Sequence, residues 1–177
     1  MKKIIAIVGL MGVGKTTIGS KLSKKLGYYF IDSDREIEDR ERKTIPEIFA
    51  QNGEKYFREV EENVIEEIAL RDEEIVLSIG GGGFVSEKTR KILSQKAITI
   101  WLHAPINEIL RRVGKRNNRP LLNQKNKRLV LEDLAKQRNP IYSQADLKFE
   151  TAIQSREILT TKIINKIREL KNEQNPS

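Results

Sequence analysis

Residues Gly9–Thr16 read GLMGVGKT and follow the apolar run Ile4–Val8. Their spacing matches G-x-x-x-x-G-K-[ST], a loop whose backbone N–H groups surround the phosphates of a nucleoside triphosphate at the start of a helix. In such a loop Lys15 reaches the β- and γ-phosphates, and the Thr16 hydroxyl binds Mg²⁺. A chance match in a glycine-rich turn is the alternative, and the position between a strand and a helix weighs against it. The residues expected to bind nucleotide are Gly12, Val13, Gly14, Lys15, Thr16 and Thr17.

Two aspartates, Asp32 and Asp34, follow the second apolar run, Tyr28–Ile31. Each could be only the N-cap of a helix. Beside a phosphate loop, however, one carboxylate could serve Mg²⁺ while the other orients an acceptor hydroxyl as a base. The third apolar run, Ile75–Ile79, contains no acidic residue. That absence favours Asp32 for the metal and leaves Asp34 for the acceptor, with both at the end of one strand.

Three arginines could bind a carboxylate or phosphate, because a guanidinium makes two parallel hydrogen bonds to such groups. Arg58 lies on an expected helix with Glu61 one turn later, which could hold the guanidinium or form only a surface ion pair with it. Arg138 precedes an Asn-Pro pair, where the helix is expected to stop, so a contact with the helix dipole is its alternative. Arg119 lies in a basic stretch and could be a solvated loop residue.

The order of apolar runs and helical patterns predicts a single α/β domain over residues 1–177, with a parallel sheet covered on both faces. The four glycines Gly80–Gly83 end the third run and could let a backbone approach a ligand, or form only a tight turn. Ligands bind at the carboxyl ends of parallel strands, where the phosphate loop, the aspartates and these glycines all fall. Strands are expected at Ile4–Val8, Tyr28–Ile31, Ile75–Ile79, Ile98–Leu102 and Leu147–Glu150. Helices are expected over about 15–26, 35–42, 44–52, 54–71, 86–95, 105–114, 129–138 and 155–171, before a frayed tail at 172–177.

The composition excludes several classes of protein. The 177 residues include no cysteine, so disulfides and thiolate metal sites are absent, and no apolar stretch approaches the ~20 residues of a membrane helix. A cytoplasmic protein without a membrane partner is expected. The net charge of +8 could indicate nucleic-acid binding or binding of small anions. The basic segment 111–128 has eight Lys and Arg but no aromatic residue for stacking on bases, which favours small anions.

Together these motifs resemble those of the shikimate kinase family over about residues 4 to 170. The resemblance is carried by GLMGVGKT (Gly9–Thr16), DSD (Asp32–Asp34), FREVE (Phe57–Glu61), Gly80–Gly82, RPLL (Arg119–Leu122) and RNPIY (Arg138–Tyr142). It implies a P-loop fold like that of nucleoside monophosphate kinases, with five parallel strands in the order 2-3-1-4-5. It also implies a substrate-binding region at about 33–61 and a lid at about 113–127.

The activity implied by the resemblance is transfer of the ATP γ-phosphate to the 3-hydroxyl of shikimate, with Mg²⁺, in aromatic amino-acid biosynthesis. A monomer is expected. The implied catalytic residues are Lys15, Asp34 and Arg119, and the implied metal-binding residues are Thr16 and Asp32. The implied substrate-binding residues are Asp34, Arg58, Gly80, Gly81, Gly82 and Arg138. Arg112 resembles an arginine that stacks on adenine, and Arg119 also contacts the nucleotide.

Other functions remain open from the residues alone. The nearest alternative is another small-molecule P-loop kinase, acting on gluconate or a nucleotide, which a panel of acceptors would distinguish. A nucleic-acid-binding P-loop protein is a different class, and the lack of aromatic residues in the basic stretch argues against it. A catalytically inactive regulatory module is a third, and the complete set Lys15, Thr16, Asp32 and Asp34 argues against loss of activity.

Overall fold

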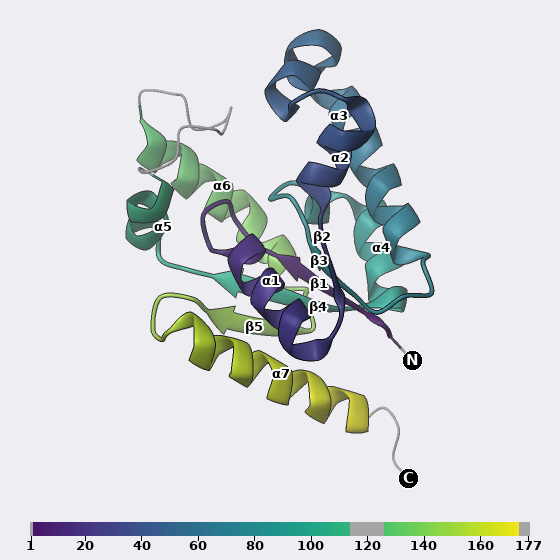
Figure 1. Cartoon of the computed structure of the whole chain (residues 1–177). Helices are drawn as coiled ribbons and strands as arrows, with labels where there is room; N and C mark the ends of the chain where they lie inside the picture. Colours follow the sequence, from purple (N-terminus) through teal and green to yellow (C-terminus); the bar gives the residue numbers. More distant parts are fainter. Residues whose placement is uncertain (1, 114–125, 174–177) are drawn as a thin grey trace.

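A five-stranded parallel sheet forms the centre of the chain, whose computed structural model describes residues 2–113 and 126–173 (Figure 1). The strands lie in the order β2-β3-β1-β4-β5, and every neighbouring pair is parallel. Both the predicted α/β class and the predicted strand order are therefore confirmed. The strands are β1 (Ile4–Val8), β2 (Tyr29–Asp32), β3 (Ile75–Ser78), β4 (Ala97–His103) and β5 (Leu147–Glu150).

Helices cover both faces of this sheet. Helices α1 and α7 pack together on one face (Figure 1). The helices are α1 (Lys15–Leu26), α2 (Ser33–Glu41), α3 (Ile45–Ala69), α4 (Glu87–Lys96), α5 (Ile106–Val113), α6 (Lys127–Tyr142) and α7 (Arg156–Glu173), with a short 3₁₀ turn η1 (Gly83–Val85). Among the described residues, no helix is long and apolar enough to cross a membrane.

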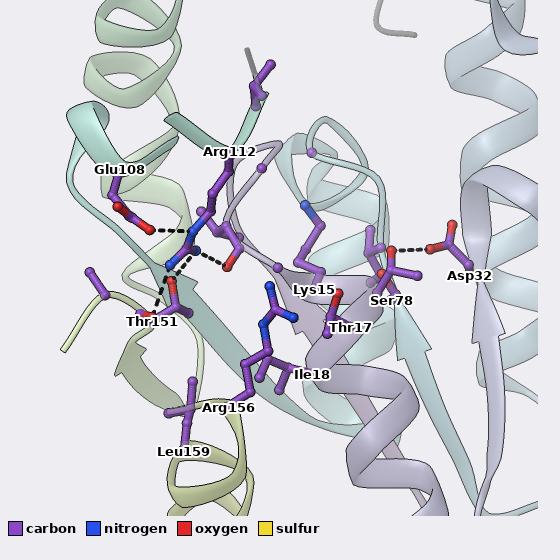
Figure 2. Close-up of a pocket in the computed structure, with 18 of the residues that line it drawn as sticks. Lys15, Thr17, Ile18, Asp32, Ser78, Glu108, Arg112, Thr151, Arg156 and Leu159 are labelled. Carbon is purple, nitrogen blue, oxygen red and sulfur yellow. Dashed lines mark hydrogen bonds and ion pairs between the residues drawn. The ribbon is translucent and has the colours of Figure 1, made fainter. Parts of the chain in front are cut away.

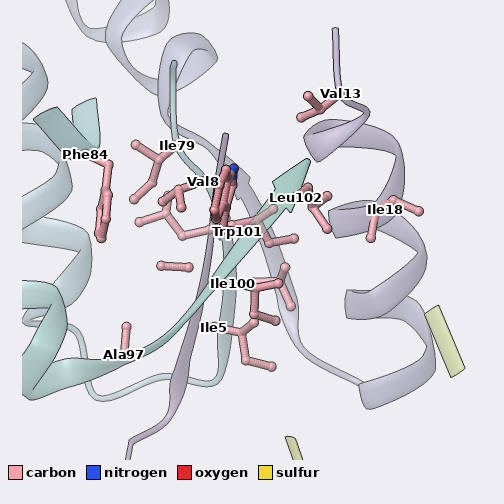
Figure 3. Packing of buried hydrophobic residues seen from close by; sticks show 14 of the residues in the cluster. Ile5, Val8, Val13, Ile18, Ile79, Phe84, Ala97, Ile100, Trp101 and Leu102 are labelled. Carbon is pink, nitrogen blue, oxygen red and sulfur yellow. The ribbon is translucent and has the colours of Figure 1, made fainter. Parts of the chain in front are cut away.

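The core explains why the central strands are mostly apolar. All residues of β1 and β3 are buried, because both faces of the sheet are covered. Figure 3 shows Phe84 of η1 and Ile18 of α1 on opposite sides of these strands. Burial on both sides fixes the carboxyl ends of the strands, where the loops of the site begin.

Two helices begin or break close to where the sequence predicts. Helix α3 begins with a capping box between Thr44 and Glu47 and is interrupted at Gly53, whose φ of 81° and ψ of 172° are not helical. The expected pair of helices on either side of Gly53 is thus confirmed. Helix α2 begins two residues earlier than expected, because the Asp32 side chain caps it by accepting a hydrogen bond from Asp34 N. Asp34 therefore lies in the first turn of a helix and not at a strand end.

The expected stop of a helix before Asn139 is wrong. Helix α6 continues through Pro140 to Tyr142, and the Asn139 carbonyl accepts a hydrogen bond from Ser143 N at 2.9 Å. Proline in the last turn removes one donor, and the buried Tyr142 at the end of the helix holds the turn in place. Arg138 is therefore one full turn inside the helix, and the helix-dipole interpretation of its position does not apply.

Two expected segments are only partly described. Asn172 and Glu173, expected in a frayed tail, belong to α7, and 174–177 lie outside the described residues. Of the expected lid, Val113 ends α5 and Lys127 begins α6. The rest of that segment, including Arg119, lies outside the described residues apart from Asn126, which caps α6.

Candidate active site

The phosphate loop joins β1 to α1 and holds its lysine over the loop backbone. Gly14 adopts a φ of 103° just before α1, a conformation that glycine tolerates without strain. Lys15 is only 9% exposed, and its Nζ donates to the carbonyls of Gly9 at 2.9 Å and Leu10 at 3.0 Å. The loop is close-packed, because a Cβ on Gly12 would stand 2.5 Å from a Val113 methyl. The lysine is thus held in position before any phosphate binds.

A cavity of about 570 Å³ opens above this loop (Figure 2). All seven residues expected to contact nucleotide and described by the structure line it, namely Gly12, Val13, Gly14, Lys15, Thr16, Thr17 and Arg112. Figure 2 shows Lys15 between Arg112 on one side and Asp32 on the other. Asp34, Gly80 and Gly81 also line the cavity, so it continues from the phosphate loop to the glycine turn.

Asp32 performs two structural tasks at the end of β2. Its Oδ1 accepts from Asp34 N at 3.1 Å, and its Oδ2 accepts from the Thr16 hydroxyl at 2.8 Å. Two oxygen atoms that could serve as ligands for a hard cation, one from Thr16 and one from Asp32, thus lie together beside the phosphate loop. Within the described ranges no group of three or more His, Cys, Asp or Glu could hold a metal. The pair fits Mg²⁺, which typically takes one or two protein ligands and completes its shell with phosphates and water.

The glycines after β3 are required by close side chains and not by their backbone angles. A Cβ on Gly80 would lie 2.4 Å from Asp34 Oδ1, and a Cβ on Gly82 would lie 2.2 Å from Arg58 Nη1. Neither glycine has a positive φ. The turn therefore stays free of side chains so that a carboxylate and a guanidinium can stand directly against it.

Arg58 is held by carboxylates on its own helix. Its Nη1 lies 2.7 Å from Glu61 Oε2 and its Nη2 lies 3.2 Å from Glu54 Oε1, while its guanidinium carbon lies 5.1 Å from the centre of the Phe57 ring. The predicted Arg58–Glu61 contact is confirmed, and it is not a surface pair, because Glu61 is only 2% exposed. The guanidinium is thus fixed in orientation at the edge of the glycine turn.

Glu61 carries an unusual charge state for a carboxyl. Burial raises its pKa from 4.5 to about 7, and the neighbouring Arg58 lowers it only in part. Asp34 adds to the rise, and Arg138 opposes it. These influences show that two carboxyls and two guanidiniums lie within one electrostatic cluster around the glycine turn.

This cluster should give the protein a stability that depends on pH. Between pH 4.5 and about 7 the folded protein binds more protons at Glu61 than the unfolded chain does. The free energy of unfolding should therefore fall as pH rises through that window, by at most about 1.4 kcal/mol per pH unit from this group. Urea unfolding of wild type and of Glu61→Gln at several pH values measures the contribution, because the variant lacks it. Glu59→Gln, exposed on the same helix, should keep it. Identical pH slopes in wild type and Glu61→Gln would contradict the assignment.

Arg112 closes the nucleotide side of the cavity. Its Nε lies 2.8 Å from Glu108 Oε1, its Nη1 donates to the Val13 carbonyl at 3.0 Å and to Thr151 Oγ1 at 2.9 Å, and its Nη2 donates to the Thr151 carbonyl at 3.1 Å. Arg111 and then Arg112 hold the pKa of Glu108 down at about 2. The flat guanidinium is therefore fixed at the cavity wall, where an aromatic base could lie on it.

Three further residues contribute to the site although the sequence did not single them out. Ser33 is fully buried, and its hydroxyl accepts from Gly80 N at 2.9 Å. Thr151 follows β5 directly, and the rule that sites lie at the carboxyl ends of strands could have found it. Arg156 points into the cavity from the first turn of α7 (Figure 2). A cation at a helix N-terminus is unfavourable for the helix, a signal that could have marked it.

The phosphate loop, the two aspartates beside it and the cavity that they line are those of a P-loop phosphotransferase. Comparisons with known proteins indicate one family. A model of the family described as shikimate kinase matches residues 11–168. The chain is 41% identical over 170 residues to shikimate kinase of Cereibacter sphaeroides, covering 92% of this chain and 85% of the relative. The chain belongs to the shikimate kinase family, and the sequence-based resemblance is confirmed.

Solved structures agree with that assignment. The shikimate kinase of Acinetobacter baumannii in complex with shikimate superposes with a TM-score of 0.90 at 40% identity, covering 95% of this chain and 94% of that one. The shikimate kinase of Aquifex aeolicus gives 0.81 at 30% identity, covering 98% and 99%. A gluconokinase of Sinorhizobium meliloti gives 0.65 at 16% identity, covering 98% and 96%, and this similarity extends to the fold alone.

Proposed function

We propose that the chain transfers the γ-phosphate of ATP to the 3-hydroxyl of shikimate, giving shikimate 3-phosphate and ADP. The observation that carries the proposal is the set of charged side chains at the glycine turn, where Asp34 stands against Gly80, Arg138 near Gly81 and Arg58 against Gly82, and where Asp34 and Gly80 also line the nucleotide cavity. An acceptor with a carboxylate and a nearby hydroxyl fits that arrangement. Membership of the family and the shikimate complex of the Acinetobacter baumannii relative support the same acceptor.

Residues of the phosphate loop act on the phosphoryl group. Phosphoryl transfer needs mainly positioning and charge stabilisation, and backbone N–H groups of Gly12–Lys15 would surround the phosphates. Lys15, already held over the loop, supplies positive charge to the transferring group. Arg119, outside the described residues, stays a prediction as a further cation for that group.

Asp34 acts on the acceptor. Its carboxylate stands against Gly80 in the first turn of α2, where it can accept a hydrogen bond from the reacting hydroxyl and take its proton. Arg58 and Arg138 bind the acceptor's carboxylate from two helices, α3 and α6. The carboxylate then fixes the ring so that one hydroxyl meets Asp34.

Mg²⁺ is proposed as the resident cation, held by Thr16 and Asp32 directly or through water. It would offset the charge of the phosphate oxygens. The short contact between the Thr16 hydroxyl and Asp32 keeps both donors beside the loop.

The metal role of Asp32 gives a specific expectation. Asp32→Asn should raise the Mg²⁺ concentration needed for half-maximal activity by roughly 10- to 100-fold, because an amide is a poorer ligand for a hard cation. Asparagine is as good an N-cap as aspartate, so helix α2 should be kept. Activity is measured against Mg²⁺ concentration for Asp32→Asn and for Asp34→Asn. If excess Mg²⁺ rescued both variants equally, the division of roles between the two aspartates would be wrong.

The function itself is tested by ADP release with ATP, Mg²⁺ and shikimate. Shikimate-dependent ADP is expected, with little ADP when gluconate or a nucleoside monophosphate replaces shikimate. ADP release that ignores shikimate would reject the proposal. We propose that the protein acts as a monomer. We place the reaction in the cytoplasm, where ATP is available.

A further inference from the structure

Helix α6 presents two side chains of the RNPIY stretch to the glycine turn. Arg138 and Tyr142 are four residues apart, and because the helix continues through Pro140 they lie on the same helical face. Had the helix stopped before Asn139, this alignment would be lost. The hydrogen bond from Ser143 N to the Asn139 carbonyl shows that the last turn is intact.

The Tyr142 ring is fully buried between two aromatic rings. Its centre lies 6.5 Å from that of Phe84 and 6.2 Å from that of Trp101. Figure 3 shows Phe84 and Trp101 in the core beside β1 and β4. These contacts hold the ring whether or not it carries a hydroxyl, so the polar atom has a separate purpose.

The Tyr142 hydroxyl donates a hydrogen bond to the Gly81 carbonyl. Burial raises the pKa of Tyr142 to about 12, against the smaller opposing effects of the Arg138 guanidinium, which acts on the phenol both through its charge and as a direct hydrogen-bond partner. The phenol is therefore a proton donor at every pH at which the enzyme would work. This contact ties the end of α6 to the middle of the glycine turn.

Gly81 lies where three parts of the site meet. A Cβ placed there would lie 3.4 Å from Arg138 Nη1 and 3.6 Å from Met11 N in the phosphate loop. Moving the Gly81 carbonyl would therefore change the place of the guanidinium relative to the turn. The Tyr142 hydroxyl therefore acts on Arg138 in two ways, directly as a hydrogen-bond partner of the guanidinium and indirectly through the Gly81 carbonyl.

The geometry points to Tyr142 as a positioning residue whose hydroxyl, directly and through Gly81, sets where the Arg138 guanidinium stands and thereby the affinity for the acceptor's carboxylate. The inference rests on the proposed function, because it requires an acceptor carboxylate at Arg138. Tyr142 itself touches no reacting atom. Removing the hydroxyl oxygen of Tyr142 should weaken acceptor binding while the ring keeps its packing in the core.

Tyr142→Phe tests this with one atom removed. The KM for shikimate should rise about tenfold, the scale expected when a buried carbonyl loses its donor, while kcat falls less. The KM for ATP should stay within about twofold, since the phosphate loop keeps its own contacts. The ratio of the shikimate KM values should be the same at pH 7 and pH 9, because the phenol does not titrate there. Tyr28→Phe is the control, as its hydroxyl accepts from Lys171 Nζ at 3.1 Å on α7, and its shikimate KM should not change.

A double variant separates positioning from general loosening. If Tyr142 acts through Arg138, adding Tyr142→Phe to Arg138→Ala should change shikimate binding much less than it does in wild type. Shikimate binding is followed by calorimetry where turnover is slow, well below each variant's unfolding midpoint. An unchanged shikimate KM in Tyr142→Phe, or an undiminished effect in the Arg138→Ala background, overturns the inference. A wild-type enzyme without shikimate-dependent ADP release would instead reject the proposed function, and the inference with it.

Discussion

Replacing the carboxylate of shikimate by a carboxamide should lower kcat/KM by at least about 10³-fold. Arg58 is fixed by Glu61 and Glu54 before substrate arrives, so little orientation entropy is lost when an anion binds. With a neutral acceptor, the guanidiniums of Arg58 and Arg138 would lose water without gaining the acceptor's carboxylate in exchange, and such desolvation of charge is costly. The loss should appear mainly in KM for the acceptor, with the KM for ATP little changed.

A substitution at Arg138 tests the same carboxylate site in a second way. Arg138→Lys should recover little of the activity lost in Arg138→Ala, because an ammonium cannot make the paired hydrogen bonds of a guanidinium. Arg40→Lys is the control, since Arg40 pairs with Glu67 on the surface. Steady-state kinetics with shikimate and its carboxamide decide the matter. Efficient use of the carboxamide, or an Arg138→Lys enzyme close to wild type, would remove the carboxylate site and its support for this substrate.

Asp34→Asn should lower kcat by roughly 10²- to 10⁴-fold, the usual contribution of a general base. Asparagine keeps the size of aspartate and can still accept a hydrogen bond from the acceptor hydroxyl, but it takes up no proton. The KM for ATP should stay within about twofold, because the phosphate loop joins β1 to α1 and includes no residue of α2. Single-turnover measurements with saturating ATP and shikimate isolate the chemical step.

The matched variant for Asp34 lies on the same helix. Asp39→Asn changes an exposed aspartate on α2 and should leave kcat unaltered. A fall in kcat of similar size in both variants would mean that charge on α2, and not a base at the acceptor, explains the loss. A normal kcat in Asp34→Asn would assign the proton to another acceptor, such as the phosphate itself.

The sheet and phosphate loop were predictable because their signals are local. A buried strand is apolar along its length, and the G-x-x-x-x-G-K-T spacing has one common structural meaning. Helix ends near Pro140 were not predictable from local rules. The preference of the residue before proline for an extended backbone was overcome by burial of Tyr142, which depends on Phe84 and Trp101 from distant parts of the chain.

The residues of the candidate site also divide into those that a local sequence signal marks and those that only the fold brings together. Lys15 and Asp32 were found because a motif or a strand end marks them. Ser33 accepts from a backbone N–H that only the fold brings near, and nothing in its neighbouring residues indicates that partner. Thr151 could have been found by its place after a strand, but its contact with the Arg112 guanidinium could not. Reasoning from the sequence therefore finds the residues that the chemistry requires, and it misses the residues that hold them in place.

The glycine turn after β3 also restricts how this enzyme could diverge. Because Gly80 and Gly82 are pressed against Asp34 and Arg58, a larger residue at either place would displace a charged side chain in the same step. A mutation in the turn on the way to a new acceptor would therefore also move the charged side chain that stands against it. Designers who wish to change the acceptor should vary these positions jointly, as one library.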